Sequence, residues 1–194
     1  MPFVSVKVIC TPCRDMVHAG FTYDLAQLLR VSIDAVFAIS QGTYISNLRQ
    51  LLAKTAIDNG ASHVLFIDSD MRFPPDTLKQ LLRRDLDIVG ANCVQRMRKE
   101  FTARRDSQFI SSVGKTGIEQ VDTLGMGVTL MKRRVLEKMS QPWFFMSSDG
   151  TKDVGEDVNF CLKAAEHGFA VHIDHDLSQQ VRHAGLVEFG MENF

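Results

Sequence analysis

Two aspartates, Asp68 and Asp70, follow a short apolar run in the stretch HVLFIDSDM, residues 63–71. Like charges this close repel each other, so the pair is unfavourable unless a positive group lies beside it. Where a buried strand ends, the chain turns, and both carboxylates can converge on one point. Together with water and ligand oxygens they suit Mg²⁺ or Mn²⁺, which often bridge to phosphates. The structural alternative places Asp70 at the N-terminus of a helix opened by Pro74, with Asp68 bonded to loop amides.

A second acidic pair, Glu156 and Asp157, opens the helical pattern GEDVNFCLKAAEHG at residues 155–168. The positive end of the helix dipole favours anions there, so both residues can be ordinary helix-capping acids. Cys10 and Cys13 form a third candidate group. Their C-x-x-C spacing after an apolar run is also the spacing of thiol-disulfide redox pairs.

The apolar pattern of the first half alternates short continuous runs with longer helical stretches. Helices are expected at residues 16–29, at 45–60 and from Pro74 onward, and strands at residues 4–10, 33–39, 63–68 and 87–94. Continuous apolar strands joined by helical crossovers predict an α/β fold with a mostly parallel sheet covered on both faces. Ligands of such sheets bind beyond the carboxyl ends of the strands, where Asp68, Asp70 and the C-x-x-C lie.

The second half is less regular, and we expect one domain over residues 1–194, with a nucleotide-binding half (1–95) and an acceptor or catalytic half (96–194). Residues 96–106 form a basic segment that is predicted to be a loop. The remaining expected elements are a strand broken by Gly125 and Gly127, a short helix from about Arg133, an aromatic cluster at 142–153, the helix at 155–168, a strand at 169–174 and a closing segment at 181–185.

Composition excludes several classes of protein. A net charge of −1 gives no electrostatic reason to bind nucleic acid or an anionic membrane. No stretch approaches the roughly 20 apolar residues of a transmembrane helix, and the N-terminus lacks the pattern of a signal peptide. Four cysteines in 194 residues do not suggest a disulfide scaffold, so we expect a cytoplasmic protein.

Between Cys10 and Gly185 the sequence resembles the nucleotide-sugar-dependent glycosyltransferases of the GT-A fold, especially the family 2-like group. The motifs behind this resemblance are the strand with DSDMRFPP, then GMGVTLMKRRVLEKM, GEDVNFCLKAAEHGF and VRHAG, in that order. The resemblance implies a Rossmann-like fold in which the D-x-D holds Mn²⁺ or Mg²⁺ and the cation holds the donor diphosphate. These roles fall on Asp68 and Asp70, with Ser69 between them.

The same resemblance implies roles for other residues. Asp157, with Glu156 as neighbour or alternate, would be the general base that deprotonates an acceptor hydroxyl, and His183 would complete the metal site, with His175 as its competitor. Donor-binding positions would be Thr11, Pro12, Arg14, Arg49, Asp68, Ser69 and Gly127. Relatives often have Arg-Asn where this chain has Arg49-Gln50. The alternative for Arg49 is an exposed helix residue.

For three segments of the sequence, two interpretations remain open. Gly125 and Gly127 either let the backbone approach the substrate or form a β-bulge. Trp143 and the two phenylalanines after it either stack on a sugar ring or pack in the core. The basic loop at 96–105 either closes over the diphosphate or is a solvated surface.

The predicted function is a metal-dependent glycosyltransferase that moves a sugar from a nucleotide-sugar, first of all a UDP-sugar, to a hydroxyl acceptor such as a glycan, with inversion. One alternative is a catalytically silent nucleotide- or sugar-binding module on the same fold. The other is a thiol-disulfide oxidoreductase that uses Cys10 and Cys13.

Overall fold

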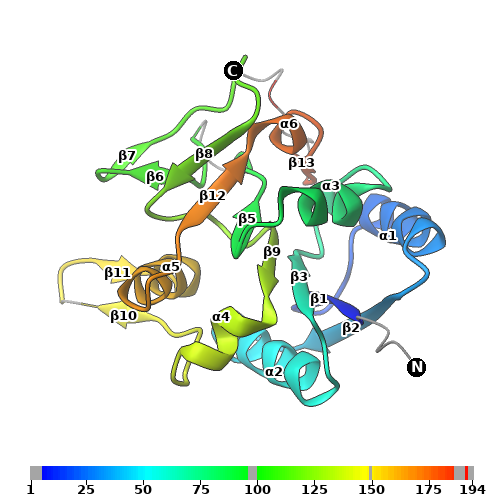
Figure 1. The fold of residues 1–194 in the computed structure, drawn as a ribbon, viewed down its shortest axis with the longest axis horizontal. Helices are drawn as coiled ribbons and strands as arrows, with labels where there is room; N and C mark the ends of the chain where they lie inside the picture. Colours follow the sequence, from blue (N-terminus) through cyan, green and yellow to red (C-terminus); the bar gives the residue numbers. More distant parts are fainter. Residues whose placement is uncertain (1–5, 96–99, 149, 186–190, 192–194) are drawn as a thin grey trace.

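A computed structural model describes residues 6–95, 100–148, 150–185 and 191. The fold is mixed α/β, with a central seven-stranded sheet between two layers of helices (Figure 1). The strand order is β2-β1-β3-β9-β5-β12-β8. Strands β2, β1, β3, β5 and β12 run in one direction, whereas β9 and β8 run the opposite way. The prediction of a mostly parallel, Rossmann-like sheet is therefore confirmed.

The elements have the following bounds. The sheet consists of β1 (Lys7–Cys13), β2 (Ala35–Gln41), β3 (His63–Ile67), β5 (Ile88–Gly90), β8 (Ile118–Val121), β9 (Val128–Lys132) and β12 (Val171–Asp174). The helices are α1 (Ala19–Val31), α2 (Ile45–Asp58), α3 (Thr77–Arg84), α4 (Arg133–Lys138), α5 (Glu156–Glu166) and α6 (His175–Ser178). Short strands form three two-stranded pairs: β4 (Met71–Arg72) with β13 (Arg182–His183), β6 (Arg104–Arg105) with β7 (Gln108–Phe109), and β10 (Ser147–Ser148) with β11 (Asp153–Val154).

Helices cover the sheet on both faces, as Figure 1 shows. Helices α1, α3 and α6 contribute Phe21, Leu78 and Leu177 to one buried cluster with the sheet. Helices α2, α4 and α5 pack on the other face, where Phe160 of α5 stacks on Phe144 with ring centroids 4.8 Å apart. Since both faces of the central strands are buried, their residues are apolar without alternation, which is the pattern expected of a covered sheet.

The antiparallel strand β9 lies between β3 and β5 and places a glycine next to the acidic pair. Its first residue, Val128, is in register with Ile67, the last residue of β3. The next residues outward, Gly127 and Asp68, are joined by a hydrogen bond from the Asp68 amide to the Gly127 carbonyl at 3.0 Å. The chain after β3 then turns into β4, which pairs with β13 and so brings His183 opposite Met71.

Several predicted boundaries are wrong. Strand β1 continues to Cys13, because β2 pairs with it along its whole length. The fourth strand is shorter than 87–94, and the predicted broken strand, which starts at residue 121, contains only β9, since β8 ends at Val121. The segment expected to be a basic loop contains β6, which pairs with β7 just after it, although residues 96–99 lie outside the described part of the chain. Strands from residues 1–95 and 96–194 alternate in one sheet, so the two halves share a core.

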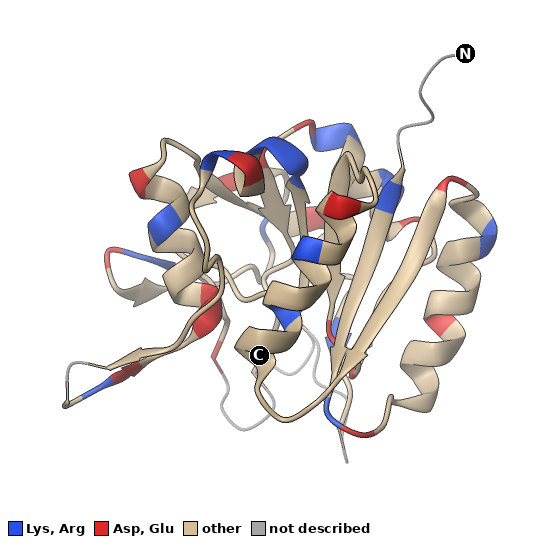
Figure 2. Ribbon diagram, turned by 90° about the horizontal axis from the view of Figure 1, so that it is seen from below, with Lys and Arg blue, Asp and Glu red and all other residues tan. Residues whose placement is uncertain are grey.

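Charged residues are interspersed over the helices and loops, without a face of one sign in the view of Figure 2. This distribution agrees with the near-zero net charge. Within the described residues, no helix is both long enough and apolar enough to cross a bilayer.

Candidate active site

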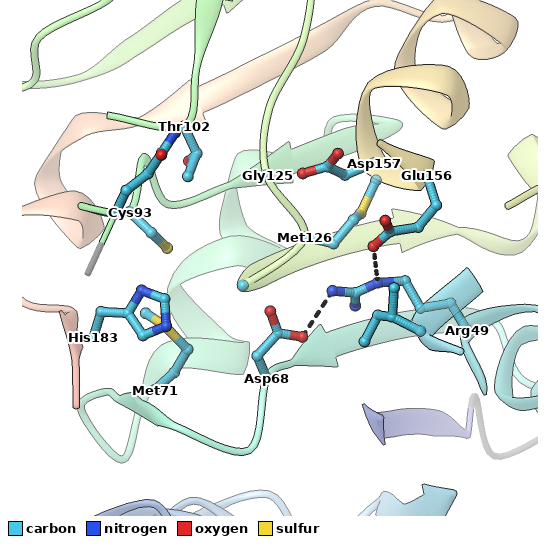
Figure 3. Close-up of a pocket in the computed structure, with 13 residues that line it drawn as sticks. Arg49, Asp68, Met71, Cys93, Thr102, Gly125, Met126, Glu156, Asp157 and His183 are labelled. Carbon is cyan, nitrogen blue, oxygen red and sulfur yellow. Dashed lines mark hydrogen bonds and ion pairs between the residues drawn. The ribbon is translucent and has the colours of Figure 1, made fainter. Parts of the chain in front are cut away.

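A hollow of about 400 Å³ opens beyond the carboxyl ends of β3 and β5, the position expected for ligands of such sheets. Figure 3 shows its side chains, which come from both halves of the chain. The lining residues are Ile45, Arg49, Asp68, Met71, Cys93, Gln95, Thr102, Gly125, Met126, Gly127, Glu156, Asp157 and His183. The hollow therefore brings together the first aspartate of the D-x-D, the acidic pair of α5 and the C-terminal histidine.

Arg49 links two acids that are far apart in the sequence. Its Nη2 donates to Asp68 Oδ1 at 2.8 Å, and its Nε donates to Glu156 Oε1 at 3.1 Å (Figure 3). The side chain is only 3% exposed, and its guanidinium also lies 5.4 Å from the centroid of the Phe66 ring. The interpretation of Arg49 as an exposed helix residue is therefore wrong. One guanidinium nitrogen, Nη1, is buried without a partner among the described residues.

The electrostatics of the hollow are dominated by acids. Burial raises the pKa of Asp68, Arg49 opposes this shift, and the nearby Asp70 and Glu156 add to it. The acids in turn hold the pKa of Arg49 above its usual value despite burial. Arg49 thus lies among several carboxyl groups that repel one another. This distribution of charge favours the binding of a further cation.

His183 lies against the second aspartate of the D-x-D. Its Nε2 is 3.3 Å from Asp70 Oδ2, and its Nδ1 is 3.1 Å from the Val94 carbonyl. A carbonyl only accepts, so Nδ1 must carry the proton, and a neutral ring then directs the Nε2 lone pair at the carboxylate. Two facing acceptors need a proton or a metal ion between them.

The chemistry of this donor set fits a divalent cation. Carboxylate oxygens of Asp68 and Asp70 with an imidazole nitrogen suit Mn²⁺, and the carbonyl bond of His183 is the outer-shell contact common to metal-binding histidines. Among the described residues, no three such groups already stand at metal-binding spacing, and one oxygen of Asp68 accepts a hydrogen bond from Arg49. The capping alternative is wrong: α3 has Asp76 at its N-cap, and Asp68 binds a guanidinium instead of loop amides.

Asp157 lies in the first turn of α5, where its Oδ1 accepts a hydrogen bond from the Val158 amide at 2.8 Å. A Cβ on Gly155 would lie 2.8 Å from that oxygen, so glycine at the N-cap lets the carboxylate fold back over the helix start. Burial is the main cause that raises the pKa of Asp157, followed by the charge of Glu156. A carboxylate with a raised pKa is a stronger base, as general-base chemistry requires.

The two glycines of the predicted broken strand precede β9 and do not form a bulge in it. A Cβ on Gly125 would lie 2.8 Å from Cβ of Thr102, and one on Gly127 would lie 3.2 Å from Sγ of Cys93. Neither glycine has a positive φ. Close approach is thus the reason for glycine here, and at both positions the close neighbour is a side chain of the wall of the hollow.

The predicted nucleotide-binding residues divide between buried and open positions. Thr11 and Pro12 were predicted to follow the first strand and bind the donor. They are instead buried inside β1 and do not line the hollow. Arg14 and Ser69 line a second hollow of about 550 Å³, together with Asp70. This second hollow and the first therefore lie on the two sides of the D-x-D.

Three other interpretations are decided by burial. Cys10 and Cys13 are both buried in β1, three residues apart in extended chain and hence about 10 Å apart, too far for a disulfide. Burial also raises the pKa of Cys10 to about 12, so the redox interpretation is wrong. His175 is buried between Ser112 and Glu119, away from the D-x-D. Trp143 is a core residue whose Nε1 donates to main-chain carbonyls.

Some lining residues had no signal in the sequence. Thr102 belongs to the segment expected to be irregular and Gln95 directly precedes it, while Cys93 and Met71 resemble ordinary core residues. The Oγ1 of Thr102 is buried without a hydrogen-bond partner among the described residues. Only the pairing of β4 with β13 and the route of the chain after β5 bring these residues to the site.

Comparisons with known proteins support the fold. No family profile matches the sequence, and a search of curated proteins finds no significant match. The chain is similar to A197 from STIV, with a TM-score of 0.67, 18% identity, and coverage of 92% of this chain and 85% of that one. Looser similarity links it to residues 1–349 of TarS from S. aureus (TM-score 0.47, 15% identity, 87% and 57% coverage) and to the inositol-1-phosphate CTP transferase from T. maritima (TM-score 0.46, 14% identity, 88% and 85% coverage). The match to A197 shows that this fold occurs in another protein.

Proposed function

We propose that the protein is a metal-dependent glycosyltransferase of GT-A type that transfers a sugar from a nucleotide-sugar, first of all a UDP-sugar, to a hydroxyl acceptor with inversion. The observation that carries the proposal is the convergence of Asp68, Asp157 and His183 on one hollow at the carboxyl edge of the sheet. The three residues come from the end of β3, the start of α5 and β13. A structural role alone would not require acids and a histidine from three segments to face one opening.

Each side chain has a defined task in this reaction. Asp157 takes the proton of the acceptor hydroxyl, and the oxygen then attacks the anomeric carbon of the donor. The bond from that carbon to the diphosphate breaks, and the diphosphate leaves with the electron pair. Arg49 holds Asp68 and Glu156 in place through its two hydrogen bonds and is a positioning residue in this scheme.

The cation would be held by Asp68, Asp70 and His183, and when bound it supplies positive charge to the leaving diphosphate. The buried acids around Arg49 leave the hollow with an excess of negative charge, which would repel a diphosphate without that cation. Donor binding is therefore expected to depend on the metal.

A thermal-shift screen tests the proposal. UDP-, GDP- and dTDP-sugars are added with and without Mn²⁺, and stabilisation follows RT ln(1 + [L]/Kd). We expect one nucleotide class to raise Tm only when Mn²⁺ is present, and release of its nucleoside diphosphate to follow on incubation. Equal stabilisation with and without metal would contradict the metal role. Binding without any turnover across acceptor mixtures would favour the catalytically silent module.

A further inference from the structure

A third hollow, of about 330 Å³, adjoins the first on the far side of Asp157. Asp157, Gln95 and Thr102 line both hollows, so these residues form the wall between them. The rest of the third hollow comes from the hairpins β6–β7 and β10–β11 and from the first two turns of α5, whose positions are shown in Figure 1. A molecule in this hollow and a donor in the first would therefore both reach Asp157.

The walls of this third hollow combine an apolar surface with charged groups of both signs. Val154, Val158 and Leu162 form the apolar part, and the charged side chains are those of Arg104, Lys152, Asp153 and Asp157. An apolar wall beside polar groups suits the two faces of a pyranose ring, one of C–H groups and one of hydroxyls. Of the two cations, Arg104 is the one on which a demand for an anionic group on the ligand can rest.

Arg104 is positioned to meet that demand. Its guanidinium lies 4.2 Å from the centroid of the Phe109 ring, and it makes no ion pair with any described residue. The next residue, Arg105, is directed elsewhere and forms an ion pair with Glu119 at 3.0 Å. Successive side chains of a strand point to opposite faces, which explains why the two arginines differ. Of the two, only Arg104 lines the third hollow.

We propose that the third hollow is the acceptor site and that the acceptor carries a carboxylate or a phosphate near the hydroxyl that reacts. Arg104 holds the anion, and the hydroxyl faces Asp157. Guanidinium binds both anions through paired hydrogen bonds. The inference rests on the proposed function, because it takes Asp157 as the base. In the reaction the hydroxyl proton goes to Asp157, the acceptor oxygen bonds to the anomeric carbon, and the diphosphate departs with the electrons of the broken bond.

The test uses matched pairs of pyranosides as probes on the full chain loaded with UDP and Mn²⁺. Glucuronate against glucose examines a carboxylate, and glucose 6-phosphate and mannose 6-phosphate against their neutral sugars examine a phosphate. Binding is measured by saturation-transfer NMR and titration. We expect at least one charged probe to bind about tenfold more tightly than its neutral partner, the order of one charge-assisted hydrogen bond.

Two variants distinguish binding of the anion by Arg104 from the general effect of removing a positive charge. Arg104→Gln should remove the preference for the charged probe and leave UDP–Mn²⁺ binding unchanged, whereas Arg105→Gln, one residue away, should keep both. Charged probes that bind no better than neutral ones, or a preference that survives in Arg104→Gln, would overturn the proposal. Loss of UDP–Mn²⁺ binding in Arg104→Gln would overturn it as well, by assigning Arg104 to the donor. If the wild-type chain fails to bind UDP and Mn²⁺ yet keeps an Arg104-dependent anion preference, the proposed function fails and the anion site stands.

Discussion

Arg49 of α2 donates a hydrogen bond of 2.8 Å to Asp68 at the end of β3, and both residues border the same hollow. The same guanidinium reaches Glu156, which is 107 residues later in the chain. One buried cation thereby ties the end of β3 to the helix that carries Asp157. The geometry of the site depends on this connection more than on any local motif.

Replacing Arg49 with Met should destabilise the fold and abolish turnover. The substitution leaves Asp68 and Glu156 without their shared cation, and breaking a buried pair in this way costs about 3–5 kcal/mol. Urea unfolding and turnover measure the two effects. The control is Lys54→Met on the same helix, whose exposed pair with Asp58 contributes about 0.5 kcal/mol or less. Equal stabilities of the two variants would show that the buried connection is energetically unimportant.

Replacing Asp157 with Asn should remove transfer and raise stability. Loss of a general base lowers the rate by about 10²–10⁴-fold, while UDP–Mn²⁺ binding should remain, because Asp157 is not a metal ligand in this scheme. Burial beside Glu156 raises the pKa of Asp157, so its charged form destabilises the folded state. Calorimetry at pH 7 should therefore show a higher Tm for Asp157→Asn. A variant that loses nucleotide binding while staying folded would place Asp157 in the donor site instead.

The pH dependence follows from the same shift. For an acid whose folded pKa is raised, the folded state binds more protons than the unfolded state between the unfolded pKa, about 4, and the folded pKa. Stability therefore falls as pH rises through that window, and the stability gain of Asp157→Asn should vanish when the pH is lowered below it. The acidic limb of the kcat/KM profile, which reports the free enzyme, should lie above pH 4. An acidic limb at or below pH 4 would mean that Asp157 is not the titrating base.

Arg84 provides a stability prediction away from the site. Its Nε and Nη2 donate to the carboxylate of Asp174, which has no exposure, and Nη2 also donates to Asp176 at 2.6 Å. Arg84→Ala would leave Asp174 buried without its cation, so we expect a loss of about 3 kcal/mol. Arg83→Ala, one residue earlier and exposed, should change the unfolding free energy by about 0.5 kcal/mol or less. Similar losses in both variants would show that the bonds from Arg84 to Asp174 are not the cause, since alanine does not lower helix propensity.

Local sequence patterns predicted the order of helices and strands well, because apolar periodicity and Gly or Pro signals act over a few residues. They could not predict that β9 enters the sheet antiparallel between β3 and β5, since that pairing joins segments about 60 residues apart. The D-x-D and the acidic start of α5 carried recognisable spacing. The bond from Arg49 to Glu156 and the turn of Arg104 toward the third hollow depend on tertiary packing and left no such pattern.

The proposed reaction depends most on a divalent cation bound by Asp68, Asp70 and His183 together with the donor diphosphate. Mn²⁺ binding in the presence of UDP can be followed by the EPR signal of free Mn²⁺, with Asp70→Asn as the test and Asp58→Asn, an exposed residue of α2, as the control. We predict that the wild-type chain and Asp58→Asn bind Mn²⁺ equally and that Asp70→Asn binds it at least about tenfold more weakly. Equal Mn²⁺ binding by Asp70→Asn and the wild-type chain would contradict the proposed metal site.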